Sequence, residues 1–166
     1  MNFEIKKNKI INNIKDFINI SDLQVKNLED FVLLLLQQNQ QYNLIGKSTI
    51  DDIWERHILD SAQLFKFIDN KNVKFADFGS GAGLPGIILS ILGVKEMNLI
   101  EKSFRKAQFL QQAKIISKNK IFIHQAKLEE LSNIKFDCIT SRALASLDKL
   151  LTYSQSFLAK DGYCLF

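Results

Sequence analysis

Apolar residues change their spacing along the chain near residue 73. Before it, apolar side chains recur every three or four residues among lysines and asparagines, which predicts amphipathic helices. These helices are expected over residues 1–20, 21–40 and 51–68, and Ser21 or Asp22 can cap the second. After it, short apolar runs alternate with longer amphipathic stretches, which is typical of alternating strands and helices.

The second part of the chain is expected to hold five strands and three helices. The expected strands are 74–78, 96–101, 121–124, 136–140 and 163–166, and the expected helices are 84–92, 103–117 and 146–159. Only the short segment 125–131 separates the third strand from the fourth, so there is little room for a long crossover helix there. This order predicts an open, doubly wound α/β sheet of the Rossmann-like class. Residues 1–72 would form a helical extension packed on a core of residues 73–166, as one structural unit.

The helix over 103–117 is expected to bury one apolar face. The side chains expected to be buried are Phe104, Ala107, Phe109, Leu110, Ile115 and Ile116. Arg105 and Lys106 lie on its polar face, and we expect both to be solvated.

The stretch from Lys74 to Gly86 reads K-F-A-D-F-G-S-G-A-G-L-P-G. A strand, a glycine-rich turn and a helix start in this order are typical of a nucleotide-binding turn in an α/β sheet. The glycines let the backbone turn sharply and let a ligand approach the main chain. Pro85 suits the first turn of the following helix, and Gly86 would let that helix lie close to the strand.

The spacing of the glycines favours one class of ligand. The dinucleotide fingerprint G-x-G-x-x-G fits only from Gly81, and that frame starts late and contains Pro85. The pattern that starts at the strand end is acid-x-G-x-G-x-G, formed by Asp77, Gly79, Gly81 and Gly83. It resembles the first motif of S-adenosylmethionine-dependent methyltransferases.

Glu101 is a second acid in a useful place. It ends the next apolar run, 22 positions after Gly79, where a carboxylate can accept hydrogen bonds from both ribose hydroxyls. Two other interpretations stay open at this point. The chain could be an oxidoreductase that binds NAD or FAD, or the turn could bind nothing in a plain structural α/β domain.

Charge and cysteine content narrow the class of protein. The chain of 166 residues has a formal net charge of +4, which suits an anionic partner such as RNA and also an ordinary soluble surface. Cys138 and Cys164 fall on expected strands, which favours core residues in a reduced compartment. No Cys/His cluster has the spacing of a metal site, and the longest apolar run, 31–36, is too short to span a bilayer. We therefore expect a cytoplasmic protein without a metal or a membrane partner.

Only three of the 22 basic residues are arginines, and two of them have notable neighbours. Arg56, His57 and Asp60 lie within about one turn of the helix over 51–68, either as a surface ion pair beside a half-buried histidine or as part of a site. Arg142 follows the strand 136–140 directly. Since ligands bind outside the carboxyl ends of strands in such sheets, Arg142 is placed to meet a ligand.

Five stretches occur in an order that is specific to one family. They are N-L-I-G at 43–46, R-H-I-L-D-S at 56–61, D-F-G-S-G-A-G-L-P-G at 77–86, L-E-E at 128–130 and S-R-A-L-A-S-L at 141–147. Together they resemble the glucose-inhibited division protein B (GidB, RsmG) family, which methylates guanine N7 in 16S ribosomal RNA. The resemblance covers about residues 28–166.

The resemblance implies S-adenosylmethionine as cofactor and the 16S rRNA of the small ribosomal subunit as partner, and we expect a monomer. It implies cofactor contacts at Gly79, Leu84, Glu101, Leu128, Glu129 and Arg142. It also implies that Arg56, His57, Asp60 and Arg142 lie at the active site, so these four are the candidate catalytic residues.

One departure from the family concerns the carboxyl-terminal end. The family continues past the fifth strand with further strands, whereas this sequence ends at Phe166. We therefore expect C-terminal strands to be missing and a sheet edge to be exposed. A truncated, inactive relative that only binds the cofactor or rRNA is the corresponding alternative.

Overall fold

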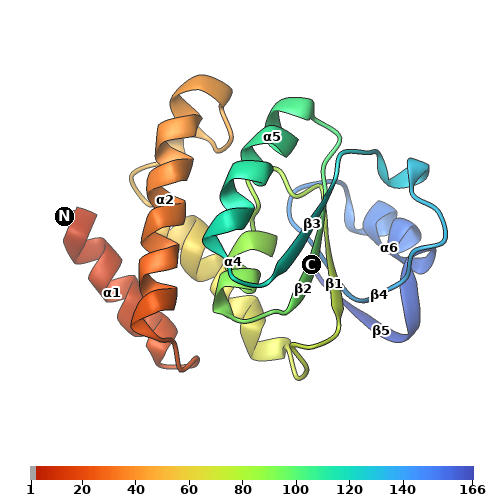
Figure 1. Ribbon diagram of the computed structural model, residues 1–166, viewed down its shortest axis with the longest axis horizontal. Helices are drawn as coiled ribbons and strands as arrows, with labels where there is room; N and C mark the ends of the chain where they lie inside the picture. Colours follow the sequence, from red (N-terminus) through yellow and green to blue (C-terminus); the bar gives the residue numbers. More distant parts are fainter. Residues whose placement is uncertain (1–2) are drawn as a thin grey trace.

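The computed structural model describes residues 3–166. The N-terminal extension begins with two helices that run in roughly opposite directions (Figure 1). These are α1 (Phe3–Lys15) and α2 (Asp22–Tyr42). Ser21 caps α2 as predicted, because its hydroxyl accepts the backbone N–H of Gln24 and the Gln24 side chain accepts the N–H of Ser21. Residues 1 and 2 of the predicted first helix lie outside the described residues.

The segment predicted as a helix over 51–68 is helical over residues 53–67, but its hydrogen-bond pattern changes along its length. After the 3₁₀ turn η1 (Lys47–Thr49), the segment forms a π-helical turn η2 (Trp54–Leu59), one α-helical turn α3 (Asp60–Gln63) and a 3₁₀ turn η3 (Leu64–Phe67). The wide π turn buries Trp54, His57 and Ile58 together. An apolar pattern over one turn cannot distinguish this geometry from an α-helix, because the two differ only in which carbonyl each N–H reaches.

The rest of the chain forms five parallel strands with short helices between them. The strands are β1 (Lys74–Phe78), β2 (Glu96–Ile100), β3 (Lys120–His124), β4 (Phe136–Ser141) and β5 (Leu158–Leu165), and the sheet order is β3-β2-β1-β4-β5. The connections are α4 (Gly86–Leu92), α5 (Phe104–Ala113), η4 (Lys114–Ile116), η5 (Leu128–Glu130) and α6 (Leu147–Gln155). The doubly wound fold is confirmed, and only the 3₁₀ turn η5 lies between β3 and β4, as expected.

Helices cover the two faces of the sheet unequally (Figure 1). Helices α4 and α5 lie on one face with α2 outside them, and Phe31 of α2 packs on Phe109 of α5 at 6.3 Å between ring centroids. The extension therefore shares the larger apolar core with the sheet. On the other face α6 and η5 cover a smaller core around Phe78, Phe136 and Phe157.

Several predicted boundaries and burials need correction. Helix α4 begins at Gly86, so Pro85 is its N-cap and not part of its first turn. Strand β5 begins at Leu158, before the predicted start at residue 163, because Leu158 already pairs with Phe136 of β4. The chain does not turn at Asp161-Gly162; the pairing with β4 only shifts its register there. Two apolar residues that were expected to be buried, Phe104 at the start of α5 and Ile115 in η4, are 59% and 78% exposed.

Candidate functional site

Three neighbouring strands end side by side at the point where the sheet order reverses. Phe78 of β1 pairs with Ile100 of β2 and with Ser141 of β4, so the residues that follow, Gly79, Glu101 and Arg142, leave the sheet at the same edge. This is the crevice where open α/β sheets bind ligands.

A cavity of about 480 Å³ opens at this edge, within the usual size range of small-molecule sites. Four predicted cofactor residues line it: Gly79, Glu101, Leu128 and Glu129. The remaining lining residues are Ile100, Lys102, Lys106, Ala126, Lys127, Ala143, Leu144, Ala145, Lys149 and Tyr153. The structure does not bring Asp77, Gly81, Gly83, Leu84 or Arg142 into this lining.

Glu101 is held in place by two backbone groups. It is buried, its Oε2 accepts the N–H of Gly81 at 2.9 Å, and its Oε1 accepts the N–H of Ser103 at 2.7 Å. Each carboxylate oxygen has a second lone pair to offer. The carboxylate thus fixes the glycine turn and still presents acceptors at the cavity.

Asp77 lies beneath the turn, fully buried. Its Oδ2 accepts the N–H of Gly86 and its Oδ1 accepts the hydroxyl of Thr140, each at 3.2 Å. Burial raises the pKa of Asp77 to about 7, against the opposing effects of the Gly86 N–H, Thr140, Ser80 and Arg142. Asp77 therefore ties β1 to α4 and β4 from below the cavity.

The glycine turn has the left-handed backbone that its sequence predicts. The φ angles of Gly79, Gly81 and Gly83 are +68°, +55° and +78°. A Cβ atom on Gly79 would lie 2.6 Å from Cδ1 of Leu144, so the loop after β4 packs directly on the turn. Leu84 lies buried in the larger core, behind the turn.

Four lysine side chains also line the cavity, and the sequence did not lead us to expect them there. Lys102, Lys106, Lys127 and Lys149 all line it. Lys106, which we expected to be solvated, is half-buried and lines this cavity, because α5 begins shortly after Glu101 at the end of β2. The position of α5 directly after β2 was the feature of the sequence that could have placed Lys102 and Lys106 at the cavity.

Across the cavity, the Tyr153 hydroxyl donates to Oε1 of Glu129 at 2.9 Å and links α6 to η5.

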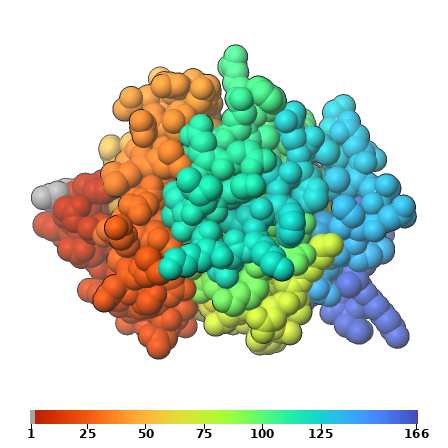
Figure 2. Space-filling view, viewed as in Figure 1, coloured from red at the N-terminus to blue at the C-terminus, as the bar shows by residue number. Residues whose placement is uncertain are grey.

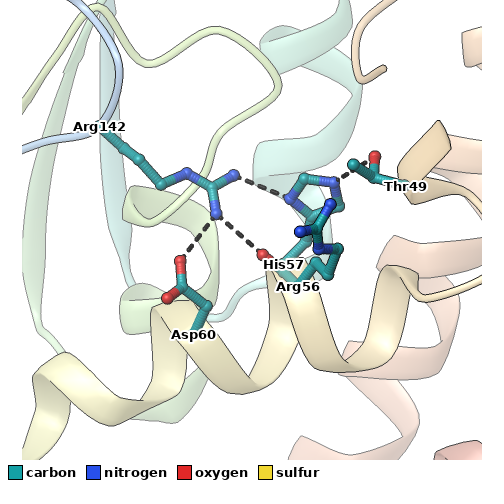
Figure 3. Close-up of polar contacts among 5 residues, drawn as sticks. All are labelled: Thr49, Arg56, His57, Asp60 and Arg142. Carbon is teal, nitrogen blue, oxygen red and sulfur yellow. Dashed lines mark hydrogen bonds and ion pairs between the residues drawn. The ribbon is translucent and has the colours of Figure 1, made fainter. Parts of the chain in front are cut away.

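Arg142 brings the four candidate catalytic residues together (Figure 3). Its Nη1 donates to Oδ2 of Asp60 at 3.0 Å and to the backbone carbonyl of Arg56 at 3.2 Å, and its Nη2 lies 3.0 Å from Nδ1 of His57. Asp60 is thus ion-paired with Arg142 and not with Arg56, the partner that helical spacing suggested. Local sequence patterns could not predict this pair, because Asp60 follows the π turn and Arg142 lies 82 positions further along the chain.

His57 is buried in this cluster and stays neutral. Burial lowers the pKa of His57 to about 4, the charges of Arg142 and Arg56 also lower it, and Asp60 opposes them. Its Nε2 lies 2.8 Å from the hydroxyl of Thr49, a contact that the sequence analysis did not foresee.

Other chemistries receive little support within residues 3–166. Cys138 is buried, and burial raises the pKa of its thiol to about 12, so it carries almost no thiolate. No group of three or more His, Cys, Asp and Glu side chains in this range is arranged to hold a metal ion. No helix in the described part of the chain is long and apolar enough to cross a membrane.

Solved methyltransferases share this fold at low sequence identity. A ribosomal protein L11 methylase from Lactobacillus delbrueckii matches with a TM-score of 0.56 and 23% identity, over 64% of this chain and 56% of that one. A magnesium protoporphyrin IX methyltransferase from Synechocystis matches with a TM-score of 0.57 and 14% identity, over 82% and 79%. These likenesses support the Rossmann-like fold.

Sequence comparisons identify the family. The model of the GidB family, described as rRNA small subunit methyltransferase G, matches residues 24–166. The ribosomal RNA small subunit methyltransferase G of Orientia tsutsugamushi is 41% identical over 160 residues, which cover 94% of this chain and 80% of that protein. The protein of the same name from Rickettsia prowazekii is 42% identical over 143 residues, 85% of this chain and 73% of that one. The five motifs, the cavity at the sheet edge and these matches agree: this chain belongs to the rRNA small subunit methyltransferase G (GidB) family.

Proposed function

We propose that this protein transfers the methyl group of S-adenosylmethionine to N7 of a guanine in the 16S rRNA of the small ribosomal subunit. Family membership supports the reaction class and the RNA substrate. The single observation that carries the cofactor site is the cavity that Gly79, Glu101, Leu128 and Glu129 line at the carboxyl edge of the sheet.

The donor set at this cavity fits the proposed cofactor. Glu101 would accept hydrogen bonds from the ribose hydroxyls, since its carboxylate is already oriented by Gly81 and Ser103. Gly79 lines the cavity where the Leu144 side chain packs on the turn, and Leu128 and Leu144 offer apolar walls. Asp77, Gly81, Gly83 and Leu84 would act from behind, by holding the turn in shape.

The Arg142 cluster would form the side of the site that meets the RNA. Bound in the cavity, S-adenosylmethionine supplies an electrophilic methyl group on a sulfonium. Guanine N7 has a free lone pair at neutral pH, so the chain needs no general base to activate it. Catalysis then comes from orientation, which in favourable cases lowers a barrier by about 7–11 kcal/mol. Arg142 offers the planar fork that recognises a guanine edge or a phosphate.

His57 has a different role in this scheme from that of an acid or base. Its ring is neutral, buried and hydrogen-bonded on both nitrogens, with a pKa held near 4. Together with Asp60 and the carbonyl of Arg56, it would orient Arg142.

The test is transfer of labelled methyl from S-adenosylmethionine to small ribosomal subunits that lack the modification. Chain cleavage at N7-methylguanine then locates the product. One modified guanine supports the proposal. Cofactor binding without transfer to any form of the subunit would instead identify an inactive relative, and the absence of cofactor binding would contradict the assignment of the cavity.

A further inference from the structure

A chain of hydrogen bonds runs from the N-terminal extension to Arg142 (Figure 3). The Thr49 hydroxyl donates to the carbonyl of Gly46 at 2.7 Å and lies 2.8 Å from Nε2 of His57. On the other side of the ring, Nδ1 lies 3.0 Å from Nη2 of Arg142. The turn η1, the nearby π turn and the distant end of β4 therefore meet through one imidazole ring.

The donors and acceptors of this chain fit in only one direction. Arginine can only donate, so Nδ1 of His57 must accept. A neutral ring then carries its hydrogen on Nε2, and Thr49 must accept it. The hydroxyl hydrogen of Thr49 is left free for the carbonyl of Gly46. The other tautomer would set the Nδ1–H of His57 against an N–H of Arg142.

The charges around the ring oppose its protonation. Arg142 at the end of β4 and Arg56 on η2 both lower the pKa of His57, as burial does, and only Asp60 on α3 raises it. The ring is therefore neutral at physiological pH, and the hydrogen bonds at its two nitrogens decide which tautomer it adopts. Thr49, half-buried in the turn η1, is the group that contacts the nitrogen opposite Arg142.

We propose that Thr49 is a positioning residue for methyl transfer: by accepting from Nε2–H, it holds His57 in the tautomer whose Nδ1 receives Arg142. This inference rests on the proposed function, in which Arg142 faces the RNA. It also gives the N-terminal extension a part in the reaction, because Thr49 and His57 both precede the core. The residues that follow Arg142, Ala143 and Leu144, line the cavity, so fixing Arg142 also fixes that wall.

The direct test is ¹⁵N NMR of the histidine rings, which the chain makes simple because it has only two histidines. His57→Gln assigns the two sets of signals by removing one. In the wild type we expect His57 as the pure Nε2–H tautomer from pH 6 to 8. A predominant Nδ1–H tautomer would overturn the proposal without any variant at position 49.

Two substitutions connect the tautomer to turnover. Thr49→Val keeps the shape of the side chain and removes the hydroxyl, and we expect mixed tautomers and a kcat about tenfold lower, the equivalent of one hydrogen bond, with KM for S-adenosylmethionine unchanged. Thr49→Ser keeps the hydroxyl and should restore both the tautomer and kcat. If Thr49→Val does not fold, Thr49→Ala serves with the same expectations.

The outcomes separate the inference from the function on which it rests. Wild-type kcat in the valine variant, or a serine variant as slow as the valine variant, would contradict a positioning role for Thr49. A wild-type protein that transfers no methyl group would contradict the proposed function instead, whatever the tautomer of His57.

Discussion

Asp77 and Glu101 are carboxylates at the same edge of the sheet, and the fold gives them opposite surroundings. Glu101 accepts two backbone N–H groups and borders the cavity. Asp77 is sealed beneath the glycine turn, where burial raises its pKa to about 7. The two acids therefore have separate roles: Glu101 borders the cavity, and Asp77 supports the turn from beneath.

Asp77→Asn should change how stability depends on pH. Between about pH 4 and 7 the folded wild type keeps a proton that the unfolded chain, with a carboxyl pKa of 3.8, has released, so its free energy of unfolding falls as the pH rises. At roughly 1.4 kcal/mol per pKa unit the fall amounts to a few kcal/mol, and the asparagine variant should lack it. Urea unfolding at pH 4.5 and 7.5 measures how much the free energy of unfolding changes with pH in each protein. Both proteins contain His57, so its contribution cancels when the two changes are compared. Equal slopes would contradict a raised pKa at Asp77.

Glu101→Ala should weaken binding of S-adenosylmethionine by about 10- to 100-fold, because hydrogen bonds to a charged acceptor contribute about 1.5–3 kcal/mol. Calorimetric titration measures the affinity. The variant also frees the N–H groups of Gly81 and Ser103, so its unfolding midpoint without ligand is needed as a control. Unchanged affinity in a folded variant would remove Glu101 from the cofactor site.

Arg142→Lys should lower turnover by roughly ten- to a hundredfold in a folded protein. The fork of Arg142 serves Asp60, His57 and the carbonyl of Arg56 at once, and a lysine ammonium cannot reproduce that geometry. Arg105→Lys, on the exposed surface of α5, is the matched control. Methyl transfer at the wild-type rate in the Arg142 variant would show that the fork has no part in the reaction.

At the scale of elements, the start of helix α4 depends on the close approach of Gly86 to strand β1. A Cβ atom on Gly86 would lie 2.9 Å from Oδ2 of Asp77 and would collide with Cδ2 of Leu99. The N–H of Gly86 makes its hydrogen bond to Asp77 across the same narrow gap. The glycine motif thus forms the turn after β1 and also lets α4 pack closely on β1.

Gly86→Ala should destabilise the fold by about 1–3 kcal/mol, as overpacking of a buried site does. Gly46→Ala is the matched control, because its Cβ would meet nothing nearer than Oγ of Ser48 at 3.9 Å. Urea unfolding of both variants compares them. A loss of stability at position 46 as large as that at position 86 would contradict the steric explanation.

At the scale of the whole molecule, the N-terminal extension and the sheet share one core. Figure 2 shows the first helices, in red and orange, at one side of the molecule, the blue C-terminal part of the chain at the other, and the intervening elements packed between them. Phe31 of α2 is fully buried against Phe109 of α5. The division at residue 72 is therefore a boundary in the sequence pattern, and we propose that both parts unfold together.

A single unfolding transition is the test of that proposal. Trp54 is the only tryptophan, it is buried in the extension, and its fluorescence should follow urea unfolding with the same midpoint as far-ultraviolet circular dichroism. Phe31→Ala should lower both midpoints together, at a cost of about 3–5 kcal/mol. Leu33→Ala, 61% exposed on the same helix, should change neither. Separate midpoints for the two probes would show two independent units.

Local sequence patterns predicted most of the fold and the shape of the glycine turn. Strands β1 to β4, the capping of α2 by Ser21 and the left-handed glycine turn follow from neighbouring residues, so the sequence analysis placed them well. The π turn at Trp54–Leu59 and the early start of β5 were missed, because each depends on partners from another part of the chain.

The sequence by itself determined the class of sheet, the glycine turn and the family. The class of sheet follows from the spacing of apolar residues, and the turn and the family follow from motifs of adjacent residues. Only the tertiary structure decided which motif residues face the cavity and which, like Asp77, support it from beneath. It also decided that Asp60 pairs with Arg142 and that Thr49 completes the histidine cluster. The physical reason is that a hydrogen bond needs a partner within about 3 Å, and the partners of His57 and Arg142 in this cluster lie 8 to 86 positions away in the sequence.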